Sequence, residues 1–149
     1  MKEFDVKKET NNVINFIRDY YKKNNLGGAI IGISGGKDSA VVAALFTKAL
    51  GSENVIGVTM PCHSNKNDKI DAKLISDYYG FEMVNFDITG VFDGFKDELK
   101  NLGDFTKDEV KNSDINLKPR LRMATLYYLA ALYSFVKGKT YLVAGTSNK

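Results

Sequence analysis

The sequence has few of the features that would tie it to an oxidising compartment or to a membrane. It holds a single cysteine, Cys62, so no disulfide can form within the chain, as fits a reducing compartment. No charged and then apolar leader opens the chain, and no apolar run approaches the roughly 20 residues that cross a bilayer. We therefore expect a cytoplasmic protein with no membrane partner.

Basic side chains are scattered, and few of them are arginines. The 21 basic and 18 acidic residues give a formal net charge of +3, and without a dense basic block we expect no nucleic-acid partner. Arginine occurs only at Arg18, Arg120 and Arg122. Because arginine binds phosphate and carboxylate through two parallel hydrogen bonds, the pair in "KPRLRM" is a better candidate ligand contact than any lysine.

The pattern of apolar runs predicts an α/β fold. The chain has 149 residues, 44% of them hydrophobic, which suffices for one domain with a real core. The runs "AIIGIS", "VIGVTM", "MVNF" and "YLVAG" are continuous, as is typical of strands buried on both faces. Helical segments separate them, so we predict a doubly wound parallel sheet with helices on both faces. The predicted helices cover about 3–24, 38–50, 66–79, 89–100 and 117–137, and the predicted strands cover 28–34, 54–60, 82–86 and 140–145.

Two of these helices are expected to pack differently. The segment 38–50 is apolar almost all round, which predicts deep packing against the sheet. In 66–79, Ile70, Leu74 and Tyr78 lie on one stripe with charged residues opposite. This stripe is expected to cover the sheet while the opposite face meets water.

The predicted sheet places four loops at one edge. In such a sheet, ligands bind beyond the carboxyl ends of the strands, where the strand order reverses. The loops at these ends contain "SGGKDS", "TMPCHSN", "FDITG" and "GTSNK". If the strand order is 3-2-1-4, the reversal falls between the first and last strands, and residues 34–39 lie beside Gly145 and Thr146.

The segment "SGGKDS", residues 34–39, has the composition of an anion-binding loop. Gly35 and Gly36 permit close backbone approach and positive φ, and successive N–H groups before a helix bind anions. A plain strand-to-helix turn is the simpler alternative. The spacing is not that of a P-loop, because Ile31 stands where its first glycine should be, and no G-x-G-x-x-G opens the helix.

Asp38 is the unusual member of this loop, since a carboxylate repels phosphate. It could cap the helix by accepting an N–H, or it could hold a cation. Mg²⁺ prefers one or two carboxylates together with phosphate oxygens, and it would stabilise the charge of a departing pyrophosphate. On this second interpretation Asp38 is a metal ligand and Lys37 a secondary phosphate contact.

Three segments carry a resemblance to a known family. "GISGGKDS" (32–39) resembles the pyrophosphate-binding loop of the N-type ATP pyrophosphatases, which split ATP between its α and β phosphates. "NLKPRLRMATLYYLAA" (116–131) resembles the helix of NAD synthetases that carries R-x-R-M, and "VAGTSNK" (143–149) resembles their G-T-x-N segment. The resemblance extends over the whole chain and implies an adenine nucleotide alpha hydrolase-like fold.

The resemblance implies an ammonia-dependent NAD synthetase. The nicotinate carboxylate of deamido-NAD would attack the α-phosphate of ATP, giving an adenylate and pyrophosphate, and ammonia would then displace AMP. No glutamine amidotransferase domain precedes the matching segments, which points to ammonia as the nitrogen donor. NAD synthetases continue well past the position of Lys149, so residues 1–149 are expected to be a single domain lacking the family's C-terminal portion.

The same resemblance assigns site residues. Mg²⁺ would bind Asp38, and deamido-NAD would meet Arg120, which the family often supplies from the neighbouring subunit of a homodimer. Helical spacing places Tyr127 on the same face as Arg120, where its ring could stack on the pyridine or adenine of a substrate. Arg122 lies two positions from Arg120 on a helix, so the two cannot face the same ligand, and Tyr127 could equally be a core aromatic. The expected ATP contacts are Gly32, Ile33, Ser34, Gly35, Gly36, Lys37, Asp38, Ser39 and Thr146.

Other interpretations of the sequence stay open. Cys62 and His63 could form a nucleophile and base, but adjacent residues of an extended segment point apart, and Pro61 favours a turn. We therefore expect this loop to lie near the adenine. The chain could also be a non-catalytic adenine-nucleotide-binding module of the same architecture, or an RNA-modifying adenylase, although the mild charge and single cysteine weigh against the latter.

Overall fold

The computed structural model describes residues 5–64 and 67–145, and it confirms the predicted α/β class. The elements alternate along the chain, as the spacing of the apolar runs predicts. In order they are α1 (Val6–Lys23), β1 (Gly28–Gly32), α2 (Lys37–Leu50), the 3₁₀ turn η1 (Ser52–Asn54), β2 (Val55–Thr59), α3 (Asn67–Tyr79), β3 (Glu82–Asn85), α4 (Thr89–Lys100), α5 (Lys107–Lys137) and β4 (Tyr141–Ala144).

The four strands form one parallel sheet in the order β3-β2-β1-β4, which is the order considered above for placing the ligand edge. Gly32 at the end of β1 pairs with Val58 of β2, and Ile31 pairs with Ala144 of β4. The carboxyl ends of these strands are therefore aligned at one edge. The strand order reverses between β1 and β4, and this point is where such a sheet binds its ligands.

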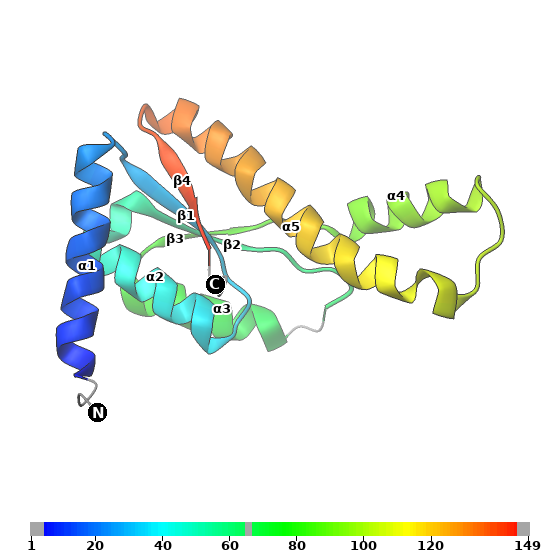
Figure 1. Cartoon of the computed structure of the whole chain (residues 1–149), viewed down its shortest axis with the longest axis horizontal. Coiled ribbons are helices and arrows are strands. Elements are labelled where there is room, and N and C mark those ends of the chain that lie inside the picture. Colours follow the sequence, from blue (N-terminus) through cyan, green and yellow to red (C-terminus); the bar gives the residue numbers. More distant parts are fainter. Residues whose placement is uncertain (1–4, 65–66, 146–149) are drawn as a thin grey trace.

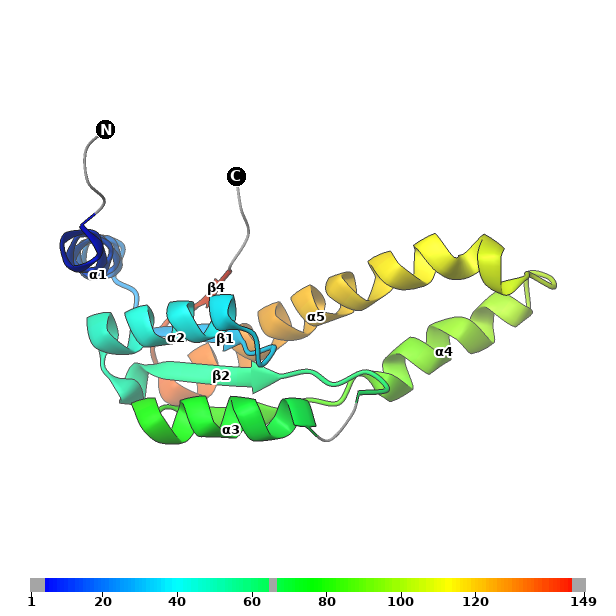
Figure 2. The same ribbon diagram turned by 90° about the horizontal axis from the view of Figure 1, so that it is seen from below.

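Helices cover both faces of the sheet because successive strand residues point to opposite sides (Figures 1 and 2). One core includes Ile30 and Val58 and is covered by α4 and α5. The other includes Ala29 and Ile31 and is covered by α1, α2 and α3. Within this second layer α1 packs on α2, where Arg18 donates to the carbonyl of Ala49 through Nε (3.1 Å) and to that of Lys48 through Nη2 (2.9 Å).

Two expectations about helix packing need correction. Ile70, Leu74 and Tyr78 of α3 are exposed, whereas Ala72 and Ser76 are buried. The small residues let α3 approach the sheet closely, so the apolar stripe faces outward. The helix α2 is less deeply packed than expected, since most of its residues are half-buried and Val41 is 56% exposed.

Helix α4 and the N-terminal part of α5 form a hairpin that projects beyond the carboxyl edge of the sheet, while the C-terminal part of α5 lies along the sheet (Figures 1 and 2). The expected start of the second helix near residue 117 is wrong, because α5 begins at Lys107 and continues through Pro119. A capping box explains this earlier start: the Thr106 hydroxyl accepts from the Glu109 N–H while the Glu109 carboxylate accepts from the Thr106 N–H. Among the helices that the structure describes, none is long and apolar enough to cross a membrane.

Candidate functional site

The loop between β1 and α2 is held in shape by its own serines. Ser39 Oγ accepts from the Ser34 N–H (3.2 Å) and donates to the Gly36 carbonyl (3.0 Å). The Ser34 hydroxyl lies 3.2 Å from Ser39 Oγ and accepts from the Gly36 N–H (3.2 Å). Gly35 has a φ of 81°, which glycine adopts without steric cost. Serine side chains therefore hold the two ends of the turn together, and Gly35 supplies the positive φ that the turn requires.

This loop delivers an uncapped helix N-terminus to the ligand edge of the sheet. The N-cap of α2 is Gly36, and no side chain caps the helix. The interpretation of Asp38 as a helix cap is therefore wrong. Unsatisfied N–H groups and the positive end of the helix dipole together favour an anion at this position.

Lys37 and Asp38 point their charges away from the protein core. Both residues are exposed, and no hydrogen bond or ion pair of either side chain occurs within residues 5–64 and 67–145. The carboxylate of Asp38 is thus free to accept a cation beside the anion-binding turn. Ile33 differs from the other predicted loop contacts, since its side chain is buried and its N–H donates to the Val58 carbonyl (2.8 Å).

Gly32 lets a second helix approach the start of the loop from the other face of the sheet. A Cβ at this position would lie 3.2 Å from Met60 Cε and 3.3 Å from Leu126 Cδ1 of α5. Gly145 follows β4 on the neighbouring strand, as the strand order requires. The predicted ATP contact Thr146 lies outside the described residues.

The residues that follow β2, 60–64, are anchored to two other elements. Arg122 of α5 donates from Nε to the Met60 carbonyl (3.2 Å). The Pro61 carbonyl accepts from the Ile88 N–H just before α4 (2.9 Å). Because both acceptors are backbone carbonyls, these two hydrogen bonds fix the path of the backbone at the beginning of segment 60–64.

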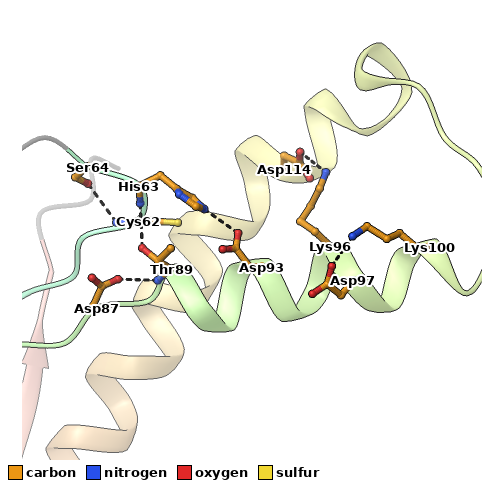
Figure 3. A network of polar contacts seen from close by, with 10 residues as sticks. All are labelled: Cys62, His63, Ser64, Asp87, Thr89, Asp93, Lys96, Asp97, Lys100 and Asp114. Atoms are coloured by element: carbon orange, nitrogen blue, oxygen red, sulfur yellow. Dashed lines mark hydrogen bonds and ion pairs between the residues drawn. The ribbon is translucent and has the colours of Figure 1, made fainter.

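The far end of this segment is tied to the first turns of α4 (Figure 3). The His63 N–H donates to Thr89 Oγ1 (3.1 Å), and His63 Nε2 lies 2.7 Å from Asp93 Oδ1. His63 has a φ of 51°, which residues other than glycine seldom adopt. The Cys62 N–H donates to the Ser64 hydroxyl (3.2 Å).

Cys62 and His63 do not form a nucleophile and base. The thiol of Cys62 is buried, while the imidazole of His63 is engaged with Asp93 at the surface. Burial raises the pKa of the Cys62 thiol, and the positive charges of Lys118 and Arg122 only partly offset this effect. The thiol therefore stays protonated at neutral pH, as expected of a structural cysteine.

Arg120 and Arg122 diverge, as their spacing predicts. Arg122 turns toward the sheet, whereas Arg120 is exposed and has no hydrogen bond or ion pair within the described part of the chain. Tyr127 is 62% exposed, and Met123 is exposed between them. The alternative that Tyr127 is a core aromatic is wrong. Among residues 5–64 and 67–145, no hydrogen bond or ion pair joins this exposed face of α5 to residues 34–39.

A hollow of about 550 Å³ lies elsewhere, between α3 and the edge strand β3. Its polar groups are engaged with one another: Thr59 Oγ1 donates to Asn85 Oδ1 (3.0 Å), and Lys73 pairs with Asp77 (2.7 Å). It contains none of the predicted site residues. The turn at residues 34–39 is instead an open feature of the sheet edge.

Two parts of this site escaped sequence reasoning. The scarcity of arginine marks Arg122 as notable, but nothing in the sequence indicates the carbonyl that it binds. His63 and Asp93 are 30 residues apart, and no spacing rule connects a loop histidine with an acid on a later helix. Only the packing of α4 against the end of β2 brings the two together.

The fold and the loop together define the class of protein. A parallel α/β sheet that presents an uncapped helix N-terminus at the reversal of strand order is the arrangement of a nucleotide-binding protein. Residues 9–149 match the NAD synthase family, and the chain belongs to this family. The resemblance of "GISGGKDS" and the R-x-R-M helix to NAD synthetases is thereby confirmed.

Similar proteins agree with this assignment. The chain is 42% identical over 143 residues to an NH₃-dependent NAD⁺ synthetase of Methanococcus aeolicus, covering 94% of this chain and 52% of the relative. It is 37% identical over 141 residues to that of Carboxydothermus hydrogenoformans, covering 95% of this chain and 54% of the relative. The chain spans about half the length of these curated relatives.

A solved structure supports the fold assignment. The NH₃-dependent NAD synthetase of Campylobacter jejuni, determined with a nitrate ion, is 35% identical and superimposes with a TM-score of 0.80. The match covers 98% of this chain and 58% of that structure. The chain therefore has the adenine nucleotide alpha hydrolase-like fold of the family.

Proposed function

We propose that residues 1–149 form an ATP pyrophosphatase domain that takes part in the ammonia-dependent amidation of deamido-NAD to NAD. The proposal is carried by the anion-binding turn at residues 34–39, which lies at the reversal of strand order in a chain of the NAD synthase family. ATP is the substrate at this turn, and AMP and pyrophosphate are the products. We place the protein in the cytoplasm.

In this proposal the backbone of the loop binds the ATP phosphates. The N–H groups at the start of α2 would meet the β and γ phosphates, which leave as pyrophosphate. Lys37 lies on the exposed side of the turn and adds a positive charge there. Ser34 and Ser39 hold the turn in the required shape through their mutual hydrogen bonds. Thr146, on the neighbouring strand's loop, is proposed as a further ATP contact.

Asp38 is proposed to hold Mg²⁺ together with the phosphates. Among the described residues no group of three or more histidine, cysteine, aspartate or glutamate side chains could hold a metal ion. A lone exposed carboxylate beside bound polyphosphate suits Mg²⁺, which takes one or two carboxylates plus phosphate oxygens and water. When bound, the ion would supply stabilisation of the negative charge on the leaving pyrophosphate.

The exposed face of α5 is proposed to bind deamido-NAD. Arg120 offers an exposed guanidinium that has no partner among the described residues, and Tyr127 offers an exposed ring that could stack on the pyridine. Because this face turns away from the sheet, we propose that it serves the site of a second copy in a homodimer. Exposed apolar side chains on the same hairpin suit such an interface. They include Phe95, Leu102, Phe105, Ile115, Met123, Tyr128, Leu132 and Phe135.

The test is product analysis with the chain at high concentration. Incubation with deamido-NAD, ATP, Mg²⁺ and ammonium should yield NAD and AMP in equal amounts. Formation of ADP in place of AMP would contradict cleavage between the α and β phosphates. Asp38→Asn should abolish product formation, and Asp108→Asn, a change of an exposed acid in the first turn of α5, is the matched control.

A binding module of the same architecture is the second candidate function, because an uncapped helix N-terminus beside the exposed Asp38 suits nucleotide binding with or without catalysis. In that case the chain binds ATP with Mg²⁺ but releases neither AMP nor NAD. Calorimetry with ATP and product analysis distinguish the two functions in one preparation. An RNA-modifying adenylase would instead consume ATP only when RNA is added.

A further inference from the structure

We propose that Arg122 is a positioning residue whose hydrogen bond to the Met60 carbonyl fixes the end of β2 that faces the nucleotide. The inference rests on the proposed function, because that function places ATP at this edge of the sheet. Arg122 Nε donates to the Met60 carbonyl (3.2 Å), and Met60 is the first residue after β2. The bond joins a charged donor on α5 to the backbone at the ligand edge.

Met60 extends this connection to the phosphate-binding turn. The methyl end of its side chain approaches Gly32, where a Cβ would be 3.2 Å away. Gly32 is the last residue of β1, directly before the turn. Leu126 lies four residues beyond Arg122 on the same face of α5. A Cβ at Gly32 would lie 3.3 Å from Leu126 Cδ1. One helix face therefore supports both the end of β2 and the start of the turn.

The remainder of the segment is anchored independently at its far end. His63 contacts Thr89 through its N–H and Asp93 through its imidazole, both on α4 (Figure 3). The left-handed φ of His63 shows that these contacts impose a conformation that the residue would not otherwise favour. Arg122 thus holds the beginning of segment 60–64, which lies beside β1, and Asp93 holds the segment near its far end.

A segment that is ordered before the ligand arrives does not have to be ordered by the ligand. Fixing a residue's backbone has an entropic cost that otherwise lowers the affinity. Without the Arg122 guanidinium, the Met60 carbonyl would lose its donor and the end of β2 would move more freely. The physical consequence is weaker ATP binding without any lost contact between Arg122 and ATP.

The experiment compares Arg122→Met, Arg122→Lys and Lys96→Met in the 149-residue chain. Calorimetry gives the ATP affinity with Mg²⁺, and hydrogen exchange of the Cys62 and His63 amides reports the order of the segment. Arg122→Met keeps an unbranched side chain and removes the donor, so we expect ATP affinity about tenfold lower, or 1.4 kcal/mol, and faster exchange. Arg122→Lys keeps the charge and a donor and should restore most of the affinity.

Lys96→Met is the control because it removes a cation from another pair between α4 and α5, Lys96 with Asp114 (2.6 Å), and leaves residues 60–64 untouched. Its ATP affinity should stay within about twofold of the unmodified chain. Equal ATP affinity in Arg122→Met and the unmodified chain would overturn the inference alone. The inference would also be overturned if Arg122→Met and Arg122→Lys lost ATP affinity equally and lost thermal stability to the same extent. Arg122 would then act only through folding. If the unmodified chain binds no ATP, the proposed function fails and the inference fails with it.

Discussion

The hydroxyl oxygens of Ser34 and Ser39 lie 3.2 Å apart across the turn between β1 and α2. Ser39 is only 4% exposed, so its hydroxyl is directed into the turn and not toward solvent. It accepts from the Ser34 N–H and donates to the Gly36 carbonyl. The shape of the turn at residues 34–39 is therefore set by its own side chains.

Replacement of Ser39 by alanine tests this relationship. Ser39→Ala removes the hydroxyl that joins both sides of the turn, and we expect ATP affinity to fall about tenfold, since each hydrogen bond contributes about 1 kcal/mol net. Calorimetry measures the ATP affinity, and thermal unfolding measures the stability of the fold. Ser76→Ala is a matched control, because Ser76 is also buried and its hydroxyl donates within α3, to the Lys73 carbonyl. A similar loss of ATP affinity in both variants would show that Ser39 acts only through global stability.

The charge of Asp38 should matter for magnesium and not for folding. Asp38→Asn keeps the size of the side chain and removes the charge that would hold the cation. We expect ATP binding to lose its dependence on Mg²⁺, with the unfolding midpoint nearly unchanged because the side chain is exposed. A titration of ATP affinity against Mg²⁺ concentration makes the measurement. Retained Mg²⁺ dependence in Asp38→Asn would contradict the assignment of the metal to this residue.

Strand positions and the strand order were predictable because both depend on simple patterns. Continuous apolar runs such as "AIIGIS" define buried strands without knowledge of their neighbours. The handedness of parallel crossovers then leaves few possible arrangements, and 3-2-1-4 is the observed one. The tight turn between β1 and α2 was predictable from its glycines, because Gly35 adopts a φ of 81° there; anion binding at this turn stays a prediction.

The packing of α3 and the start of α5 were not predictable by the same means. Periodicity predicts that Ile70 and Leu74 face the sheet, but the sheet accepts Ala72 and Ser76 at closer approach. A proline is a common reason to begin a helix, yet α5 begins earlier at the Thr106 capping box and continues through Pro119. In both helices tertiary contacts and caps outweigh local preference.

The capping box at the start of α5 predicts a pH dependence of stability. Hydrogen bonds from the Thr106 N–H and hydroxyl lower the pKa of the Glu109 carboxyl. A lowered pKa in the folded state stabilises the protein above the unfolded pKa, and this contribution is lost as the pH falls through the folded value. Glu109→Gln should therefore be less stable than the unmodified chain at neutral pH and equally stable in acid. Urea unfolding at the two pH values measures this, and an equal difference at both would contradict the prediction.

Two glycines should respond to alanine in opposite directions. A Cβ at Gly28 would collide with the ring of Tyr141, whereas nothing lies within 4 Å of a Cβ at Gly94 in α4. Gly28→Ala is expected to destabilise the fold by about 1–3 kcal/mol through overpacking. Gly94→Ala should stabilise it by about 0.5–1 kcal/mol, because alanine loses less conformational entropy in a helix. Chemical denaturation of both variants gives the two values, and a destabilised Gly94→Ala would mean that a partner covers this position.

Tyr127 and Tyr128 provide a matched pair for the proposed deamido-NAD surface. They are 62% and 68% exposed, but adjacent positions on a helix point in directions about 100° apart. Tyr127 shares the face of Arg120, so Tyr127→Ala should weaken deamido-NAD binding about tenfold if its ring stacks on a base or pyridine. Tyr128 belongs to the proposed dimer surface, so Tyr128→Ala should leave the affinity within about twofold in a preparation that is still dimeric.

Both tyrosine variants need a measurement of oligomeric state, because the same helix is proposed to form the dimer. Size-exclusion chromatography with light scattering separates loss of the dimer from loss of the ring contact. Tyr127→Phe keeps the ring and should retain the affinity of the unmodified chain. Weaker binding by Tyr127→Ala in a preparation that is still dimeric assigns the loss to stacking. Equal weakening by Tyr127→Ala and Tyr128→Ala would instead show that the whole surface acts through assembly, and Tyr127 would then have no separate role at the substrate.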